Sequence, residues 1–295
     1  MDLLLYTELT INGALVGLMY ALVALGIVLV YKASRYANLA QGAFAMTGGY
    51  ACVLITSALG LAAWAAAGVT LAALFGLGVL VERLFLRRMI GQPVIMVIML
   101  TLGLEILLRG LVPGVLGSSV KRLDLGIPQA PILLGDILID RAYLAGGTVA
   151  LLMIAGAITF FNSPLGVRMR AVSDDQVAAW SVGIRVERVI AFAWGLAGVA
   201  AGAAGILWGS VQGVDWTLSL LLLKALAIAI LGGLDSVPGA LVAGLVLGIA
   251  ESIAAGLIDP VIGGGTRDVV ASVFILLTVL VRPHGLFGRE HIERV

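Results

Sequence analysis

The sequence predicts an all-α fold, a polytopic bundle of about eight or nine transmembrane helices. Hydrophobic residues make up 61% of the 295 residues and charged residues only 12%, a balance that would not keep a domain of this size in solution. The apolar residues gather in segments close to the roughly 20 residues that a helix needs to cross a bilayer. No soluble domain, repeat period or low-complexity tract interrupts them. The chain is therefore expected to be a single transmembrane domain, residues 1–295, with the lipid bilayer as its solvent.

Nine apolar segments follow one another, and the predicted spans are residues 11–30, 37–58, 61–81, 93–116, 142–161, 189–210, 217–233, 238–257 and 268–281. The seventh and eighth meet at the turn sequence GGLDSVPG. These two could instead form a hairpin of broken helices that does not fully cross, and the parity of crossings would be the same. The N-terminal MDLLLYTELT has no basic region and no cleavage site, so the first span is expected to act as its own insertion signal.

The distribution of Lys and Arg predicts the orientation, because positively charged loops stay in the cytoplasm. With the N-terminus outside and the C-terminus cytoplasmic, the cytoplasmic loops hold Lys32, Arg35, Arg83, Arg87, Arg88, Arg168, Arg170, Arg185, Arg188, Arg282, Arg289 and Arg294. The other side holds Lys121, Arg122, Arg141 and Arg267. The segment 162–188 is thus predicted to be cytoplasmic.

The segment 117–141 is then the largest external loop. It carries Pro128, Pro131 and charges of both signs. Such a loop could simply connect two spans, or it could offer a surface to an external partner.

A short amphipathic helix is predicted within the cytoplasmic segment 162–188. Pro164 and Gly166 are expected to end the preceding span, Ser173 to cap the new helix, and Gly183 to stop it. Asp174 and Asp175 would fall in its first turn. The helix would leave a smooth apolar surface with one aromatic side chain, formed by Val177, Ala178, Trp180 and Val182. That surface suits a groove in another protein, and a plain cytoplasmic loop with a nascent helix is the alternative.

Four charged residues lie inside predicted spans: Glu105, Arg109, Lys224 and Glu251. Each charge costs about 2.5–3.5 kcal/mol on insertion scales, so such residues normally face protein or water and are paired. Glu105 and Arg109 are four residues apart on one helix, where they could neutralise each other. The four residues could be structural ion pairs that lock the bundle, or they could line a hydrated substrate path.

The second span begins with the polar residues Asn38, Gln41 and Thr47, followed by the pair Gly48-Gly49. Buried amides need partners, and glycines permit unwound or closely packed backbone. This stretch could therefore be a broken helix that lines a substrate pathway, or an ordinary close-packed contact. Pairs with GxxxG spacing predict further close contacts, within the chain or between subunits: Gly13/Gly17, Gly198/Gly202, Gly205/Gly209 and Gly244/Gly248.

The sequence lacks the motifs of the common catalytic sites. It contains no G-x-x-x-x-G-K-[ST] loop for ATP and no H-E-x-x-H metal motif, and its single cysteine, Cys52, lies in an apolar run. No catalytic residues, metal site or cofactor are expected, and a formal net charge of +1 argues against a nucleic-acid partner. The chain is not expected to be an enzyme.

Five blocks, in order along the chain, carry a resemblance to a known family. They are INGALVGLMYALVALGIVLVY, ANLAQGAFAMTGGY, RAVSDDQVAAWSVGIRVERVIAFAWGLAGVAAGAAGILWG, KALAIAILGGLDSVPGALVAGLVLGIAE and VRPHGLFG. Together they resemble the permease subunits of branched-chain amino acid ABC importers, of the LivH type. The resemblance covers nearly the whole chain, and ordered blocks are more specific than any single motif.

Two blocks imply roles for particular residues. Residues 177–183 resemble the family's "EAA…G" coupling loop, which contacts the ATPase subunit: Ala178, Ala179 and Gly183 match, and Val177 stands where the family has an acidic residue. The second-span block resembles the family's "N-F-A-H-G-E-F". There Asn38, Ala40, Gly42 and Phe44 are retained, with Gln41 in place of histidine and Ala43 in place of glutamate.

The resemblance implies a multi-pass permease of the bacterial inner (plasma) membrane that imports branched-chain or related amino acids. Its implied partners are a second, similar permease subunit, two cytoplasmic ATPase subunits and a periplasmic or extracellular substrate-binding protein. Nucleotide-driven closure of the ATPases would move the coupling helix 173–183 and alternate the access of the pathway. Urea, short amides or other small organic solutes are alternative substrates. An ion-coupled secondary transporter or channel that uses Glu105 or Glu251 is an alternative from another class, and a purely structural membrane subunit is a third.

Overall fold

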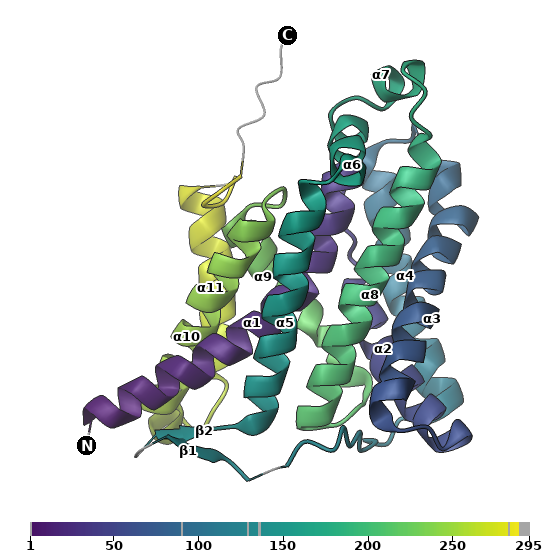
Figure 1. Ribbon diagram of the computed structural model, residues 1–295. Helices are drawn as coiled ribbons and strands as arrows, with labels where there is room; N and C mark the ends of the chain where they lie inside the picture. The colour runs from purple at the N-terminus through teal and green to yellow at the C-terminus, as the bar shows by residue number, and fades with distance from the viewer. Residues whose placement is uncertain (1, 90, 129, 135–136, 283, 289–295) are drawn as a thin grey trace.

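Helices make up most of the part of the chain that the computed structural model describes, which is residues 2–89, 91–128, 130–134, 137–282 and 284–288. Most of them run roughly alongside one another in a bundle, and the first part of α1 crosses the bundle at an angle (Figure 1). The α-helices are α1 Asp2–Ser34, α2 Gln41–Leu59, α3 Ala63–Leu84, α4 Val94–Leu116, α5 Arg141–Phe161, α6 Pro164–Asp174, α7 Gln176–Ser181, α8 Val186–Gln212, α9 Leu221–Gly232, α10 Val237–Ile262 and α11 Thr266–Val281. Two 3₁₀ turns, η1 Leu86–Met89 and η2 Trp216–Leu220, and two strands, β1 Ile132–Leu134 and β2 Ile137–Ile139, complete the elements.

Seven of the described helical segments are long and apolar enough to cross a membrane by length and composition. They are Leu4–Ser34, Gln41–Leu59, Ala63–Met89, Val94–Leu116, Arg141–Phe161, Val186–Gln212 and Val237–Ile262. The two remaining predicted spans lie in shorter helices, one in Trp216–Gly232 and one in α11. The chain is thus a polytopic helical membrane protein, as the composition predicted.

The bundle has two ends that are held by different contacts. We call the end at which α7 lies the α7 end. There Lys32 Nζ donates a hydrogen bond of 2.7 Å to the carbonyl of Asp235, in the turn between α9 and α10. At the opposite end, the hairpin end, Asn12 Nδ2 donates to the carbonyl of Leu138 at 2.9 Å. The start of α1 lies at the hairpin end and the last turn of α11 at the α7 end (Figure 1).

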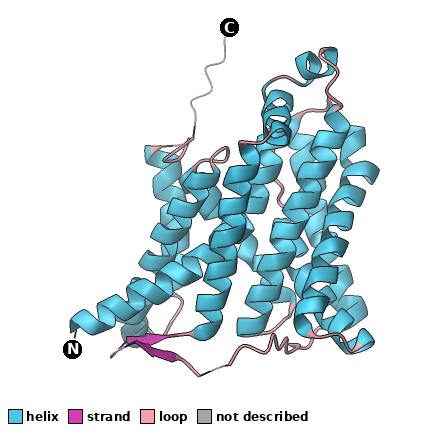
Figure 2. Cartoon of the chain, viewed as in Figure 1, coloured by secondary structure: helices cyan, strands magenta, loops and turns pink. Residues whose placement is uncertain are grey.

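The prediction of an all-α fold was wrong for the segment 117–141, because β1 and β2 form a small antiparallel hairpin there (Figure 2). Ile132 lies opposite Ile139, and Leu134 lies opposite Ile137. The sequence carried a signal for this, since aliphatic runs of three residues flank a Gly-Asp pair that suits a two-residue turn. The pair itself, residues 135–136, lies outside the described residues.

Helices α1 and α8 form the core of the bundle. Residues 16–30 of α1 are all buried, as is most of α8. Glycines allow this packing: a Cβ atom on Gly17 would collide with the carbonyl of Gly244 on α10, and one on Gly205 would collide with the carbonyl of Ala45 on α2. The GxxxG glycines that the sequence singled out therefore serve contacts within the chain.

Candidate functional site

The segment 162–188 forms two helices, α6 and α7, in place of the single helix predicted. Helix α6 is capped by Ser163, whose Oγ accepts a hydrogen bond from the backbone N–H of Gly166, and Pro164 occupies the first turn. The preceding span ends at Phe161 as predicted, and Pro164 begins a new helix, because proline after a capping serine favours a helix start. The expectation that Ser173 begins a helix, with Asp174 in its first turn, was wrong. Ser173 lies in the last turn of α6. Asp175 caps α7 instead, and its Oδ1 accepts from Val177 N at 2.8 Å and Ala178 N at 3.0 Å.

Gly183 ends α7, as the sequence predicted. Its φ of 82° is left-handed, a conformation that glycine adopts without steric cost. The N–H of Gly183 donates to the carbonyl of Trp180, and the N–H of Ile184 donates to that of Ala179, both at 3.0 Å. These two bonds form a Schellman motif, which satisfies the last carbonyls of so short a helix.

The exposed side of α7 is apolar. Val177 is 76% exposed, Trp180 60% and Val182 75%, while Ala179 is buried against the rest of the chain. Helix α7 projects beyond the other helices (Figure 1). A tryptophan and two valines in this position leave a surface without an intramolecular partner among the described residues.

Arginine side chains surround the exposed tryptophan. A cavity of about 640 Å³ lies between the end of α3 with η1, helix α7 and the start of α8, and Arg83, Arg87, Trp180, Arg185 and Arg188 are among its lining residues. Glu187 also lines this cavity and Arg87 is paired with Glu82 at 3.1 Å, but arginines outnumber carboxylates here. An apolar side chain beside such an excess of guanidinium groups is complementary to an apolar pocket with an acidic rim.

Arg35 connects this segment to the start of the second span. Its Nη2 forms an ion pair of 3.0 Å with Asp174 Oδ1, and its Nε donates to the carbonyl of Ser173 at 3.3 Å. Arg35 has a φ of 62°, which is uncommon for a residue other than glycine. The sequence indicated Arg35 only as a charge in a cytoplasmic loop, because the contact of Arg35 with Asp174 spans 139 residues of sequence.

The amides of the second span hold a buried, non-helical segment. Asn38 Oδ1 accepts from the backbone N–H of Ala40, and Asn38 Nδ2 donates to Gln41 Oε1, both at 3.0 Å. Gln41 Nε2 donates to the carbonyl of Ala197 on α8 at 3.1 Å. Thr47 Oγ1 bonds within its own helix, to the carbonyl of Ala43. Residues 35–40 therefore reach the first turn of α2 through a network in which each amide has a partner.

Glu105 also serves the start of α2. Its Oε2 accepts a hydrogen bond of 2.9 Å from the backbone N–H of Ala43, one of the first-turn donors that a helix cannot satisfy itself. A carboxylate at a helix N-terminus is favoured by the helix dipole. The expected pairing of Glu105 with Arg109 is not among the ion pairs of the described residues. Glu105 is 5% exposed and faces the bundle, whereas Arg109 is only half-buried.

Lys224 lies in a cluster of charges that joins α9, α10 and α11. Its Nζ is 2.7 Å from Glu251 Oε1 and 3.0 Å from Asp268 Oδ1, and it donates to the carbonyl of Arg267. Glu251 was among the four charged residues that the sequence suggested as ion pairs, and Asp268 was not. The second carboxylate oxygen of Glu251 is buried without a hydrogen-bond partner among the described residues.

Comparison with known proteins places these features in a family. The family model described as "Branched-chain amino acid transport system / permease component" matches residues 9–281. The chain is 28% identical to the "High-affinity branched-chain amino acid transport system permease protein LivH" of Escherichia coli (strain K12), covering 99% of this chain and 98% of that protein. It is 30% identical to the corresponding protein BraD of Pseudomonas aeruginosa, covering 98% of each. Among solved structures, "PsaBC from Streptococcus pneumoniae in complex with Fab" covers 94% of this chain and 92% of that chain, with 16% identity and a TM-score of 0.47.

Proposed function

The chain belongs to the family of branched-chain amino acid transport system permease components, and from this membership we propose that it passes branched-chain or related amino acids across the bacterial inner membrane as one subunit of an ABC importer. Separate cytoplasmic ATPase subunits supply the energy, and this chain supplies the pathway and the coupling element. Its membrane partner is a second, similar permease subunit. An external binding protein delivers the substrate.

The observation that carries this proposal is the exposed apolar surface of α7. A helix of 6 residues, closed at both ends by Asp175 and Gly183, is a rigid element that another protein can push. Asp174 is the last residue of α6 and directly precedes the cap of α7, and its ion pair with Arg35 links this point to residues 35–40 and so to the start of α2. In this proposal, closure of the ATPases displaces α7, and the movement reaches the second span through Arg35.

The proposed orientation puts the α7 end in the cytoplasm and the hairpin end outside. It is supported by the excess of Lys and Arg in the loops at the α7 end. Two of those residues, Arg289 and Arg294, lie outside the described residues. The binding protein would then meet the hairpin end, where a cavity of about 450 Å³ is lined by Arg122, Asp124 and Gln212 among others.

Selection of the substrate is assigned to the binding protein. A site that holds an amino acid tightly needs fixed partners for both its ammonium and its carboxylate group. In this chain the buried amides of Asn38 and Gln41 bond to each other and to backbone, Glu105 caps α2, and Lys224 is paired. Few polar groups therefore remain for a substrate, and the pathway is expected to bind weakly.

The purified permease pair without its binding protein should show no leucine binding at micromolar concentrations in isothermal titration calorimetry. Proteoliposomes that hold the complete importer should take up leucine only when both ATP and the binding protein are present. The binding protein alone serves as the positive control for calorimetry. Micromolar binding to the permease pair, or uptake without ATP, would contradict the proposal and favour a true binding site or ion coupling.

Replacing Gln41 by alanine should lower the rate of uptake severalfold and leave the order of substrate preference unchanged. The change removes two hydrogen bonds of a buried network, each worth about 1 kcal/mol, and so loosens the start of α2 without touching a selective site. Thr47→Val is the matched control, since the Thr47 hydroxyl bonds only within its own helix. Competition of radiolabelled leucine with valine, urea and acetamide measures preference. A switch of preference towards urea or acetamide would show that Gln41 determines specificity. It would also favour urea or short amides as the substrates of this importer.

A further inference from the structure

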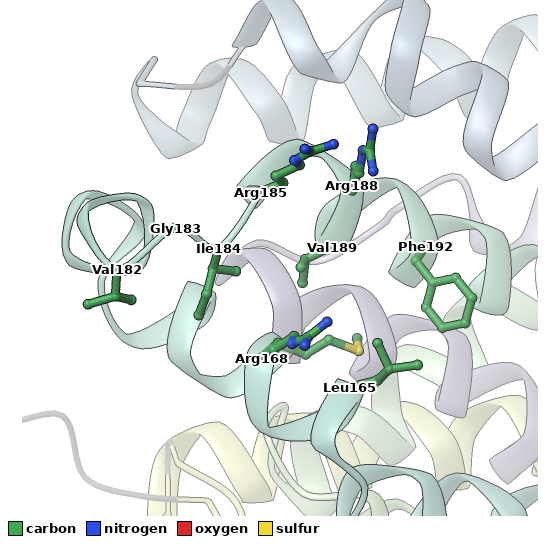
Figure 3. A pocket seen from close by; sticks show the side chains of 10 residues that line it. Leu165, Arg168, Val182, Gly183, Ile184, Arg185, Arg188, Val189 and Phe192 are labelled. Carbon is green, nitrogen blue, oxygen red and sulfur yellow. The ribbon is translucent and has the colours of Figure 1, made fainter.

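Three arginines gather around a second cavity at the α7 end. The cavity has a volume of about 690 Å³, and Arg168 of α6 lies across it from Arg185 and Arg188 at the start of α8 (Figure 3). All three side chains are exposed, and none of them belongs to an ion pair among the described residues. The backbone N–H groups that begin α8 also have no side-chain cap. Glu187, in the first turn of α8, lines the neighbouring cavity and not this one, so the lining of this cavity carries three positive charges and no carboxylate.

An apolar groove continues from this cavity along the spans. It has a volume of about 260 Å³ and runs between α5 and α8, with Met153, Phe160 and Leu196 among its lining residues. Phe192 lines both the groove and the arginine cavity, so the groove begins where the cavity ends. Gly156 adds no side chain to the groove, and the space beside its Cα is open.

We propose that this composite site binds one anionic phospholipid. The phosphate group lies among Arg168, Arg185 and Arg188, which donate charge-assisted hydrogen bonds, and one acyl chain lies in the groove between α5 and α8. The arginines stand at the edge of the membrane-spanning helices, the level at which headgroups are found, and juxtamembrane arginines attract anionic lipids.

An acidic surface of an ATPase subunit is the competing occupant of the arginine cavity. It would account for the charge but not for the groove, because Met153 and Leu196 lie within membrane-spanning helices that a soluble protein does not reach. A lipid accounts for both features with one molecule. The proposal requires only that the chain lies in a bilayer, so it stands whether or not the proposed substrate is correct.

Native mass spectrometry of the full chain in detergent, titrated with palmitoyl-oleoyl phosphatidylglycerol, tests the headgroup site. The triple variant R168Q/R185Q/R188Q should bind this lipid about a hundredfold more weakly, since each arginine near the membrane surface contributes about fivefold. The matched control is R122Q/R267Q/R282Q, which removes the same charge from three exposed arginines outside this cavity and should bind like the wild type. Equal losses in the two triple variants would show a nonspecific charge effect and overturn the proposal.

The groove is tested by Gly156→Phe, which fills it while keeping every arginine. Binding of phosphatidylglycerol should fall at least about tenfold, whereas Gly103→Phe, the same change at another helical glycine with open space beside it, should leave binding unchanged. Glycerol 1-phosphate at millimolar concentration should not displace the lipid. Unchanged lipid binding by Gly156→Phe, or displacement of the lipid by millimolar glycerol 1-phosphate, would mean a site for soluble anions only. Loss of the lipid on assembly with the ATPase subunits would assign the cavity to that interface. Each of these three results would overturn the proposal.

Discussion

Replacing Lys224 by methionine should lower the free energy of unfolding by about 3–5 kcal/mol, the cost of removing one partner of a buried ion pair. Glu251 is 1% exposed, and Lys224 is the partner of its Oε1. The other oxygen, Oε2, already lacks a hydrogen-bond partner among the described residues. The variant would therefore leave a carboxylate in the bundle with neither oxygen paired. Chemical denaturation in detergent micelles measures the change.

The double variant Lys224→Met/Glu251→Gln should recover most of that loss, because it removes the stranded charge together with its partner. Asp268→Asn is the control, since the Asp268 side chain is 86% exposed and its contact with Lys224 should contribute less than about 1 kcal/mol. A double-mutant cycle of Lys224 with Glu105 should give no coupling energy, because Glu105 accepts a hydrogen bond from the backbone N–H of Ala43 instead. Additive effects of Lys224→Met and Glu251→Gln would show that the pair does not stabilise the bundle as proposed.

Replacing Trp180 by alanine should weaken binding of the ATPase subunits at least about thirtyfold and reduce ATP-driven uptake accordingly. A central tryptophan in an interface commonly contributes 2 kcal/mol or more to binding. The side chain is largely exposed, so its loss should leave the fold of the permease intact. Surface plasmon resonance of the permease pair against the ATPase subunits measures the affinity, and uptake in proteoliposomes measures the coupling.

Trp64→Ala is the matched control for this experiment. Trp64 and Trp180 are both 60% exposed, and Trp64 lies at the start of α3, away from α7. Normal uptake and normal ATPase binding by the Trp180→Ala variant would remove α7 as the docking element. Ala179, although it matches the family's coupling loop, is a poorer probe, because it is buried and its replacement would disturb the packing of α7 itself.

The sequence predicted a helix end correctly where the conformation of a single residue determines it. Gly183 ends its helix because only a left-handed residue completes the Schellman motif there. The start of α7 was misplaced, because Ser173 and Asp175 are both good capping residues and only Asp175 caps it. Helix α6 was not predicted, although serine followed by proline, as in Ser163-Pro164, is a strong signal for a helix start. The β-hairpin was missed because its two runs of three residues are short against the long apolar spans around them.

The sequence by itself determined that this chain is a bundle of membrane helices, where those helices lie, and which polar residues lie among them. It could do so because the cost of placing charges and unpaired backbone groups in lipid acts on each span separately. Only the tertiary structure decided that α1 and α8 are central and that Glu105 caps α2, Arg35 meets Asp174 and Asp268 joins Lys224. Lipid is as apolar as a leucine side chain, so a buried helix and a lipid-facing helix have the same composition. Contacts between helices far apart in sequence then depend on how the helices pack, which no local pattern records.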